Sequence, residues 1–134
     1  MLRRQTTDAT PTRLTADNAA PSTTNSLALP NLGSYLVRLM VLAWQTAGAA
    51  GTVGDSAAWD VTALFIRGAG AGSVSRPGGG GTGLVPAYGS AGAAAWRLEI
   101  LADTTNGGVA VSGTGEANKS LNWVARVLSA EAVG

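Results

Sequence analysis

Three runs between Trp96 and Val127 decide the fold class: Trp96-Arg97-Leu98-Glu99-Ile100, Val109-Ala110-Val111 and Leu121-Asn122-Trp123-Val124-Ala125-Arg126-Val127. In the first run apolar residues alternate with Arg97 and Glu99, and in the third they alternate with Asn122 and Arg126. Successive side chains of an extended chain point to opposite faces, so each run predicts a β-strand with one buried face.

Two polar, glycine-bearing segments separate these runs. Asn106-Gly107 is typical of a tight hairpin, because both residues tolerate left-handed backbone. The segment from Gly113 to Ser120 is expected to make a second reversal. The stretch therefore predicts a β-meander and an all-β domain.

The composition fits one charge-poor domain. The chain has 134 residues, of which 46% are hydrophobic and only 13% are charged. This length suits a single domain with a core of its own. A surface so poor in charge suits a protein that packs against copies of itself or against a partner.

The residue types that are missing exclude several kinds of site. The net charge is +1 with no basic stripe, so phosphate-driven nucleic-acid binding is not expected. There is no Cys and no His, which removes thiolate and imidazole chemistry. The longest apolar run, Tyr35–Trp44, is too short to span a bilayer and contains Arg38, so no membrane partner is expected.

Residues 1–33 differ in composition from residues 34–134. They contain no aromatic residue, and Pro11, Pro21 and Pro30 prevent a regular helix. We interpret them as an extended N-terminal arm, either disordered or ordered by lying on a neighbouring surface. Its parts able to pair as short strands are residues 12–16 and 26–29. They supply four of the candidate interaction residues: Arg13, Leu14, Leu27 and Leu29.

Residues 34–134 are expected to form the β domain. Tyr35–Gln45 is apolar on both faces, which predicts a central strand or one with a covered outer face. Ala58–Arg67 predicts another strand. Gly68–Gly83 lacks the Lys-Ser or Lys-Thr pair of a phosphate loop, and predicts a long mobile hairpin tip. Leu84-Val85-Pro86 is interpreted as a short edge strand.

Neither catalysis nor a metal or other cofactor is expected. Glu99 and Asp103 lie four residues apart on one strand, too far for a tight carboxylate pair. Asp103–Gly108 lacks the alternating oxygen ligands of a calcium loop and is better explained as an Asx-type turn. The four tryptophans are expected in the core rather than in a sugar- or base-binding site: Trp44, Trp59, Trp96 and Trp123.

Several motifs together resemble a small β domain of tailed bacteriophages. They are Arg13-Leu14-Thr15-Ala16-Asp17, Asn25 with Leu29-Pro30-Asn31, Gly54-Asp55-Ser56-Ala57-Ala58-Trp59, Ala95-Trp96-Arg97-Leu98, Ala102-Asp103-Thr104-Thr105-Asn106-Gly107-Gly108, and Gly113-Thr114-Gly115-Glu116 followed by Asn122-Trp123-Val124-Ala125-Arg126-Val127. The likeness covers nearly the whole chain from about Arg13. Proteins that this chain resembles are virion components, namely tail fibre or minor tail modules and capsid decoration (cement) proteins.

From the residues and the resemblance we expect a single-domain antiparallel β-sandwich or jelly-roll-like barrel of roughly seven or eight strands. The domain stands almost alone, without a coiled-coil stalk, which favours a decoration subunit on the outer capsid surface. Its expected partners are the major capsid protein and copies of itself. They would be held by buried neutral surface and by strand addition through the arm.

Two alternatives stay open. A tail fibre or minor tail module could bind a host glycan through exposed Trp side chains or Tyr88, together with the glycine-rich segment. A small hydrolase using carboxylates is disfavoured by the absence of His and of a convincing carboxylate pair.

Overall fold

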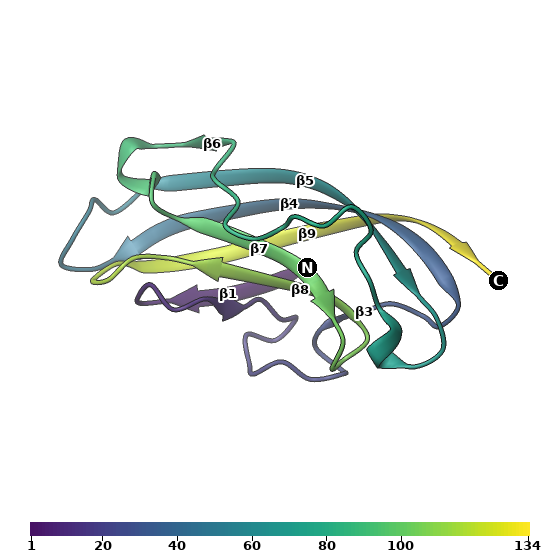
Figure 1. Cartoon of the computed structure of the whole chain (residues 1–134). Coiled ribbons are helices and arrows are strands. Elements are labelled where there is room, and N and C mark those ends of the chain that lie inside the picture. Colours follow the sequence, from purple (N-terminus) through teal and green to yellow (C-terminus); the bar gives the residue numbers. More distant parts are fainter.

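The computed structural model describes residues 1–134 and is a β-sandwich of two antiparallel sheets (Figure 1). It contains nine strands, more than expected because several are only two residues long. They are β1 (Leu2–Thr6), β2 (Thr12–Arg13), β3 (Leu27–Ala28), β4 (Gly33–Ala47), β5 (Ser56–Arg67), β6 (Tyr88–Gly89), β7 (Arg97–Asp103), β8 (Gly108–Thr114) and β9 (Ser120–Val133). The helical content is two three-residue 3-10 turns, η1 (Ala71–Ser73) and η2 (Ala91–Ala93). The all-β, single-domain sandwich is confirmed, and the finer jelly-roll description stays a prediction.

The larger sheet has the strand order β1-β9-β4-β5-β6. The central position predicted for residues 35–45 is confirmed, since β4 pairs along nearly its whole length with both β5 and β9. Its odd-numbered side chains from Tyr35 to Ala43 are buried, and its even-numbered ones from Leu36 to Trp44 are exposed. Strand alternation therefore gives this sheet one core face and one outer face.

The smaller sheet is built on the β7–β8 hairpin. The turn predicted at Asn106-Gly107 is confirmed, and Gly107 has the left-handed φ of 76° that the turn requires. The other edge of β8 pairs with β2 near Gly113 and with β3 near Val109. Both edges of β8 are therefore occupied.

The predicted meander is wrong at its second reversal. β9 does not pair with β8; it crosses to the larger sheet and pairs with β4 and β1. The physical reason is that β2 and β3 already fill the edge of β8 that β9 would need. Residues 115–119 thus connect two sheets instead of two neighbouring strands.

The core lies between the sheets and contains three of the four tryptophans. Trp59 of β5 and Trp123 of β9 stack with their ring centroids 5.3 Å apart. Trp96 is fully buried beside the β7–β8 hairpin. Trp44 is 54% exposed, so its assignment to the core is wrong: it occupies an even-numbered position of β4 and points outward.

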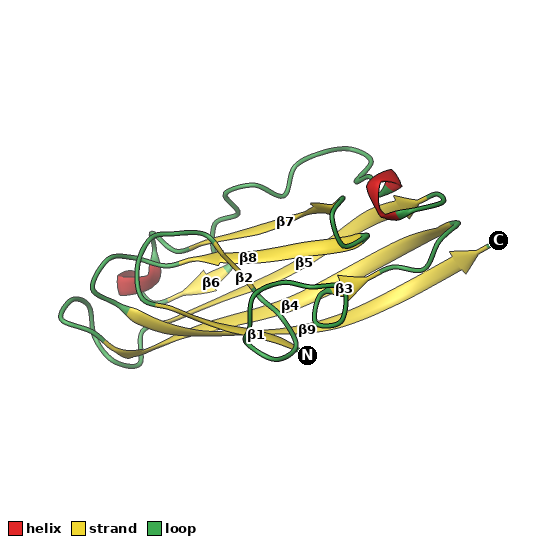
Figure 2. Cartoon of the chain, turned by 90° about the horizontal axis from the view of Figure 1, so that it is seen from below, coloured by secondary structure: helices red, strands yellow, loops and turns green.

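Residues 1–33 lie against this chain's own sandwich rather than reaching away from it (Figure 2). β1 pairs with β9 from Leu2 opposite Ala125 to Thr6 opposite Leu121. Leu14 and Leu29 are buried members of the core. The arm is thus ordered by its own domain, because its leucines fill space between the two sheets.

The glycine-rich segment is not a hairpin tip. β6 pairs with Ala57 and Ala58 at the beginning of β5, so the chain returns the full length of β5 before it forms the next strand. On the way, Ser75 bridges to Ile66, Val74 is buried, and Leu84 bridges to Leu98. The segment expected at Leu84-Val85-Pro86 therefore contributes one isolated bridge, and the short edge strand is Tyr88–Gly89 instead.

Candidate interaction face

The outer face of the larger sheet is apolar at its centre. Leu36, Met40, Leu42 and Trp44 project from β4 and are between 40% and 54% exposed. A monomeric domain seldom leaves a row of large apolar side chains on its central strand in contact with water. We call the outward side chains of β4, β5, β6 and β9 the outer face.

The strand register extends this apolar row sideways. Leu42 lies opposite Ala58 of β5 and Val124 of β9, and Ala58 lies opposite Tyr88 of β6. A second row places Leu36 between Leu64 of β5 and Ala130 of β9. Because cross-strand neighbours on one face touch, these residues form a continuous surface rather than isolated spots.

A depression of about 460 Å³ lies on the outer face. Its lining includes Met40, Leu42, Tyr88 and Val124, with Asp60 and Arg126 as charged members. Tyr88 is 74% exposed. The depression offers an apolar floor and a few polar groups at its border, which suits a protruding apolar or aromatic group of a partner.

One ion pair interrupts the apolar surface. Arg38 donates to Asp60 through Nε and a terminal nitrogen, at 2.9 and 2.7 Å, in a two-point contact. The hydrogen bonds from Arg38 lower the pKa of Asp60, and the same carboxylate raises the pKa of Arg38. The two charges neutralise each other, so the pair adds directionality to the outer face without a net charge.

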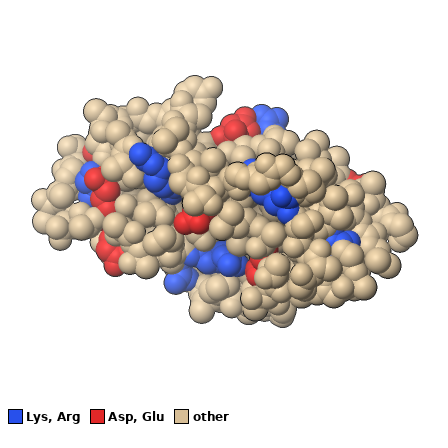
Figure 3. Space-filling model, in the orientation of Figure 1, with Lys and Arg blue, Asp and Glu red and all other residues tan.

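The rest of the visible surface is also sparsely charged. Figure 3 shows the charged side chains as single residues and small pairs on a mostly uncharged surface. No group of three Asp or Glu side chains is close enough to hold a metal ion. No helix in the structure has the length and apolar character needed to cross a bilayer.

Of the five predicted interaction residues, the three leucines pack within the fold and Tyr88 is exposed, while Arg13 forms an ion pair described below. Leu14 and Leu29 are 1% and 4% exposed and belong to the core, so in this structure they have no surface to offer a partner. Leu27 is partly buried against the same core. Tyr88 alone is widely exposed, and its role in binding stays a prediction.

Arg13 has a structural contact within the chain. Its guanidinium donates to Asp103 Oδ2 at 2.8 Å. Asp103 Oδ1 also accepts the backbone N–H groups of Thr105 and Asn106, which confirms the predicted Asx-type turn. Burial raises the pKa of Asp103, but the hydrogen bonds from Asn106 and Arg13 outweigh it and leave the pKa below its ordinary value.

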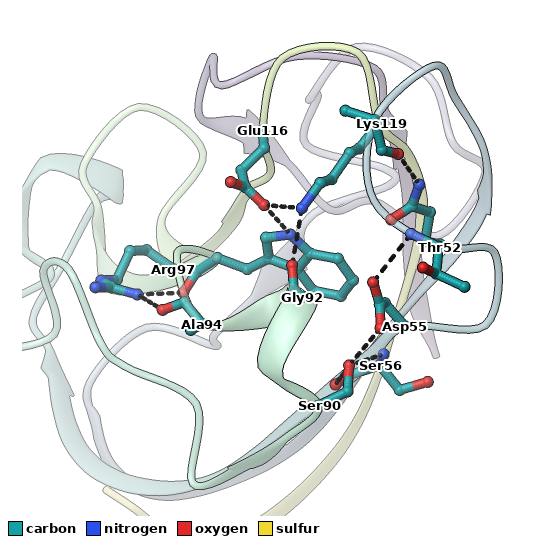
Figure 4. Close-up of polar contacts among 12 residues, drawn as sticks. Thr52, Asp55, Ser56, Ser90, Gly92, Ala94, Arg97, Glu116 and Lys119 are labelled. Carbon is teal, nitrogen blue, oxygen red and sulfur yellow. Dashed lines mark hydrogen bonds and ion pairs between the residues drawn. The ribbon is translucent and has the colours of Figure 1, made fainter.

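A cluster of polar side chains closes one end of the sandwich (Figure 4). The buried Lys119 ammonium donates to Glu116 Oε2 and to the carbonyl of Gly92, and Trp96 Nε1 donates to the same Glu116 oxygen. On a neighbouring loop, Ser90 Oγ donates to Asp55 Oδ1. Each of these groups bonds to a connecting segment, so the cluster fastens the loops at this end of the sandwich together.

The sequence alone assigned no surface role to Leu36, Met40 and Leu42, and it placed Trp44 in the core. The signal was present, because Tyr35–Gln45 is apolar at both odd and even positions. In a strand covered on both sides this pattern is ordinary, and only the tertiary structure distinguishes a covered outer face from an uncovered one.

Comparisons with known proteins found no matching family model, no matching curated protein and no matching solved structure.

Proposed function

We propose that this chain is a structural protein of a bacteriophage virion, and more specifically a capsid decoration protein. In this role many copies bind the outer capsid surface and bridge neighbouring subunits of the major capsid protein. The single observation that carries the proposal is the uncovered apolar outer face centred on Leu42 and Trp44. The charge-poor composition and the motif resemblance to tailed-phage β domains support it.

The physical basis is the burial of the outer face against the shell. Burying a fully exposed large apolar side chain contributes about 1.5–3 kcal/mol, and each side chain of the outer face, already about half covered, would contribute about half of that. The Arg38–Asp60 pair lies within the outer face and can be matched by polar groups of the shell, which restricts the orientation of the bound subunit. The N-terminal arm is not used for strand addition here, because its strands already pair with β8 and β9 of the same chain.

The test is to find the chain in phage particles produced by cells that carry its gene. Antibody raised against the recombinant protein should label the outer capsid surface in electron micrographs, at sites that repeat with the shell lattice. Particles made without the gene should rebind the purified chain to saturation. Absence of the chain from purified particles would overturn the proposal.

Variants then connect binding to the outer face. Leu42→Glu places a charge at its centre and should reduce capsid occupancy about tenfold or more, because a charge at a buried contact opposes desolvation. The matched control is Thr104→Glu, which adds the same charge at an exposed position in the β7–β8 turn and should bind normally. Equal binding by both variants would exclude the outer face as the docking surface.

A tail module that binds a host glycan is the second candidate. Trp44 and Tyr88 favour it, since both are exposed aromatic residues on the outer face, and sugar rings stack on such side chains. In this case antibody would label the tail, and the isolated chain would bind members of a glycan array. Loss of glycan binding in Trp44→Ala, with capsid labelling absent, would support the tail module over the decoration protein.

A further inference from the structure

The edge of β9 is only partly covered. On one side β9 pairs with β4 from Ser120 to Val133. On the other side it pairs with β1, and only from Leu121 to Ala125. The residues beyond, Arg126–Val133, therefore have a free edge, and Figure 2 shows this part of β9 continuing past the N-terminus.

The backbone groups on this edge can be assigned from β1. Arg3 exchanges hydrogen bonds with Thr15 on the side away from β9, at 2.8 and 3.1 Å. Because backbone groups alternate in direction along a strand, Leu2, Arg4 and Thr6 must then face β9. Their partners Ala125, Trp123 and Leu121 accordingly face β1.

The same alternation continues along β9. Val127, Ser129, Glu131 and Val133 direct their N–H and C=O groups to the free edge, while the even-numbered residues direct theirs to β4. The bond from Gly134 N to Leu32 O, on the β4 side, agrees with this assignment. The free edge thus carries a regular row of donors and acceptors without a partner strand.

Neither a proline nor a bulge blocks a further strand on this edge. Arg126–Val133 contains no Pro and no Lys, no β-bulge interrupts its pairing with β4, and its charged side chains are Arg126 and Glu131. Natural sheets use such features to prevent edge-to-edge pairing. The side chains of Ser129, Ala130 and Ala132 are small and exposed, so a neighbouring strand can approach closely.

We propose that this edge pairs with the same edge of a second copy, antiparallel and centred on Ala130, so that two larger sheets join into one. In this register Val127 lies opposite Val133 of the second copy, and Ser129 lies opposite Glu131. All the free N–H and C=O groups of the four odd-numbered residues then find partners in both copies.

The side chains are compatible with this register on both faces. On the outer face Ala130 meets Ala130 at the two-fold axis, and Leu128 meets Ala132 of the second copy. On the inner face the Ser129 hydroxyl can donate to the Glu131 carboxylate of the second copy, and no two like charges lie opposite each other. The contact is self-complementary, as a two-fold interface requires.

The register also fits the space beside β1. It places Gly134 of the second copy opposite Arg126, one position beyond the pair formed by Leu2 and Ala125. The added strand therefore reaches the end of β1, where Gly134 of the second copy meets Met1, the residue before Leu2, and one of these two terminal residues must turn aside. Shifting the centre to Ser129 would place Val133 of the second copy opposite Ala125, a position that β1 already fills.

Sedimentation equilibrium of the full chain tests the pairing. The wild-type chain should form dimers, and Ser129→Pro should weaken dimerisation by about tenfold or more, since it removes a donor from the edge of each copy. Ser129 N does not bond to β4, so the substitution leaves the sheet hydrogen bonds within the chain intact. Ser129→Ala keeps the backbone N–H and loses only the hydroxyl, so it is the matched control and should weaken dimerisation far less than Ser129→Pro. Circular dichroism verifies that both variants are folded.

A cysteine cross-link tests the register even if Ser129→Pro folds poorly. The chain has no cysteine of its own. Ala130→Cys would place two sulfur-bearing residues in a non-hydrogen-bonded pair about 4.5 Å apart at Cα, within the range of a disulfide. Under mild oxidation with oxidised glutathione, which takes up the two electrons, this variant should become a covalent dimer on a denaturing gel.

Ala132→Cys and Ser129→Cys are the register controls and should cross-link far more slowly. A wild-type chain that stays monomeric at every concentration would overturn the proposal. So would a dimer in which Ala132→Cys or Ser129→Cys cross-links as fast as Ala130→Cys. Because these tests need no phage particle, their failure is distinct from a failure of the proposed capsid function.

Discussion

Asp103 illustrates how a single carboxylate joins the N-terminal arm to the smaller sheet. It accepts a hydrogen bond from Arg13 and two from the backbone of the β7–β8 turn. Asp103→Asn keeps the size of the side chain but removes its charge, and should cost about 1–3 kcal/mol of the free energy of unfolding at pH 7.

The loss should depend on pH in a defined direction. Because the folded pKa of Asp103 is lowered, its contribution is complete above the ordinary Asp range near pH 4 and disappears as the pH falls through the lower folded value. The free energies of unfolding of wild type and Asp103→Asn, measured with urea, should therefore differ at pH 7, and the difference should shrink as the pH falls below the ordinary Asp range. A difference that does not change with pH would contradict this account. Asp60→Asn, in an exposed ion pair, is the control and should change little.

Gly113 is required by the indole of Trp123. A Cβ at this position would lie 2.5 Å from Trp123 Cδ2, and this ring is held by stacking on Trp59 and by a hydrogen bond to Thr6. Gly113→Ala should destabilise the fold by about 1–3 kcal/mol through overpacking. Chemical denaturation measures this, and Gly72→Ala, with no atom near its Cβ, is the matched control. Equal stability of the two variants would show that the ring can move aside.

Among the elements, the N-terminal arm contributes to the stability of the core, although its polar composition does not indicate this. Leu14 is 1% exposed in the core, whereas Leu42 is 52% exposed on the outer face. Leu14→Ala should cost about 2–5 kcal/mol, and Leu42→Ala should leave the free energy of unfolding almost unchanged. Thermal and urea unfolding test the pair, and an arm variant as stable as wild type would mean that residues 1–33 are not part of the cooperative unit.

The local sequence pattern predicted where the strands lie better than it predicted which strands pair with each other. Alternation identified β4, β5, β7 and β9, and Asn106-Gly107 identified the β7–β8 hairpin. Whether β9 pairs with β8 or with β4 depends on which edges are already occupied. This is decided by β2 and β3, which lie about eighty residues or more from β8 in the sequence, and the local segment contains no such information.

The same limit applies to the candidate surfaces. The two-sided apolar pattern of residues 35–44 indicated that something covers β4, but it could not distinguish a layer of this chain from a separate partner. The arm residue Leu14 lies between Arg13 and Thr15, and Leu29 lies between Ala28 and Pro30, so neither belongs to a long apolar alternation that would mark it as core. The free edge of β9 begins where its pairing with β1 ends, at Ala125, and this is a property of the assembled sheet.

For the whole molecule, the dominant contacts join distant parts of the chain. β1 pairs with β9, and β4 pairs with β9 along almost its full length. Such pairings require long loops to close, which costs conformational entropy before the stabilising contacts form. Folding should therefore be slow for a domain of this size, in about milliseconds to seconds. Stopped-flow tryptophan fluorescence can follow it, because Trp59 and Trp123 come together only in the folded core. Folding within microseconds would contradict this expectation.

The two proposed contact surfaces are separate and can act together. The outer face points away from the sandwich, while the free edge of β9 lies in the plane of the larger sheet. Edge pairing would therefore place two outer faces side by side with a common orientation. Two weak contacts to one shell would then act as a bivalent contact, which binds more tightly than either contact alone.

The pairing of β1 with β9 has a consequence for synthesis on the ribosome. Leu2–Thr6 are translated early, yet the strand that receives them emerges only after more than a hundred further residues. Until then the apolar odd-numbered side chains of β4 also lack the neighbour that completes their sheet. β1 and one edge of β4 therefore stay without their partner strand until β9 has been synthesised, whereas the β4–β5 pairing can form earlier.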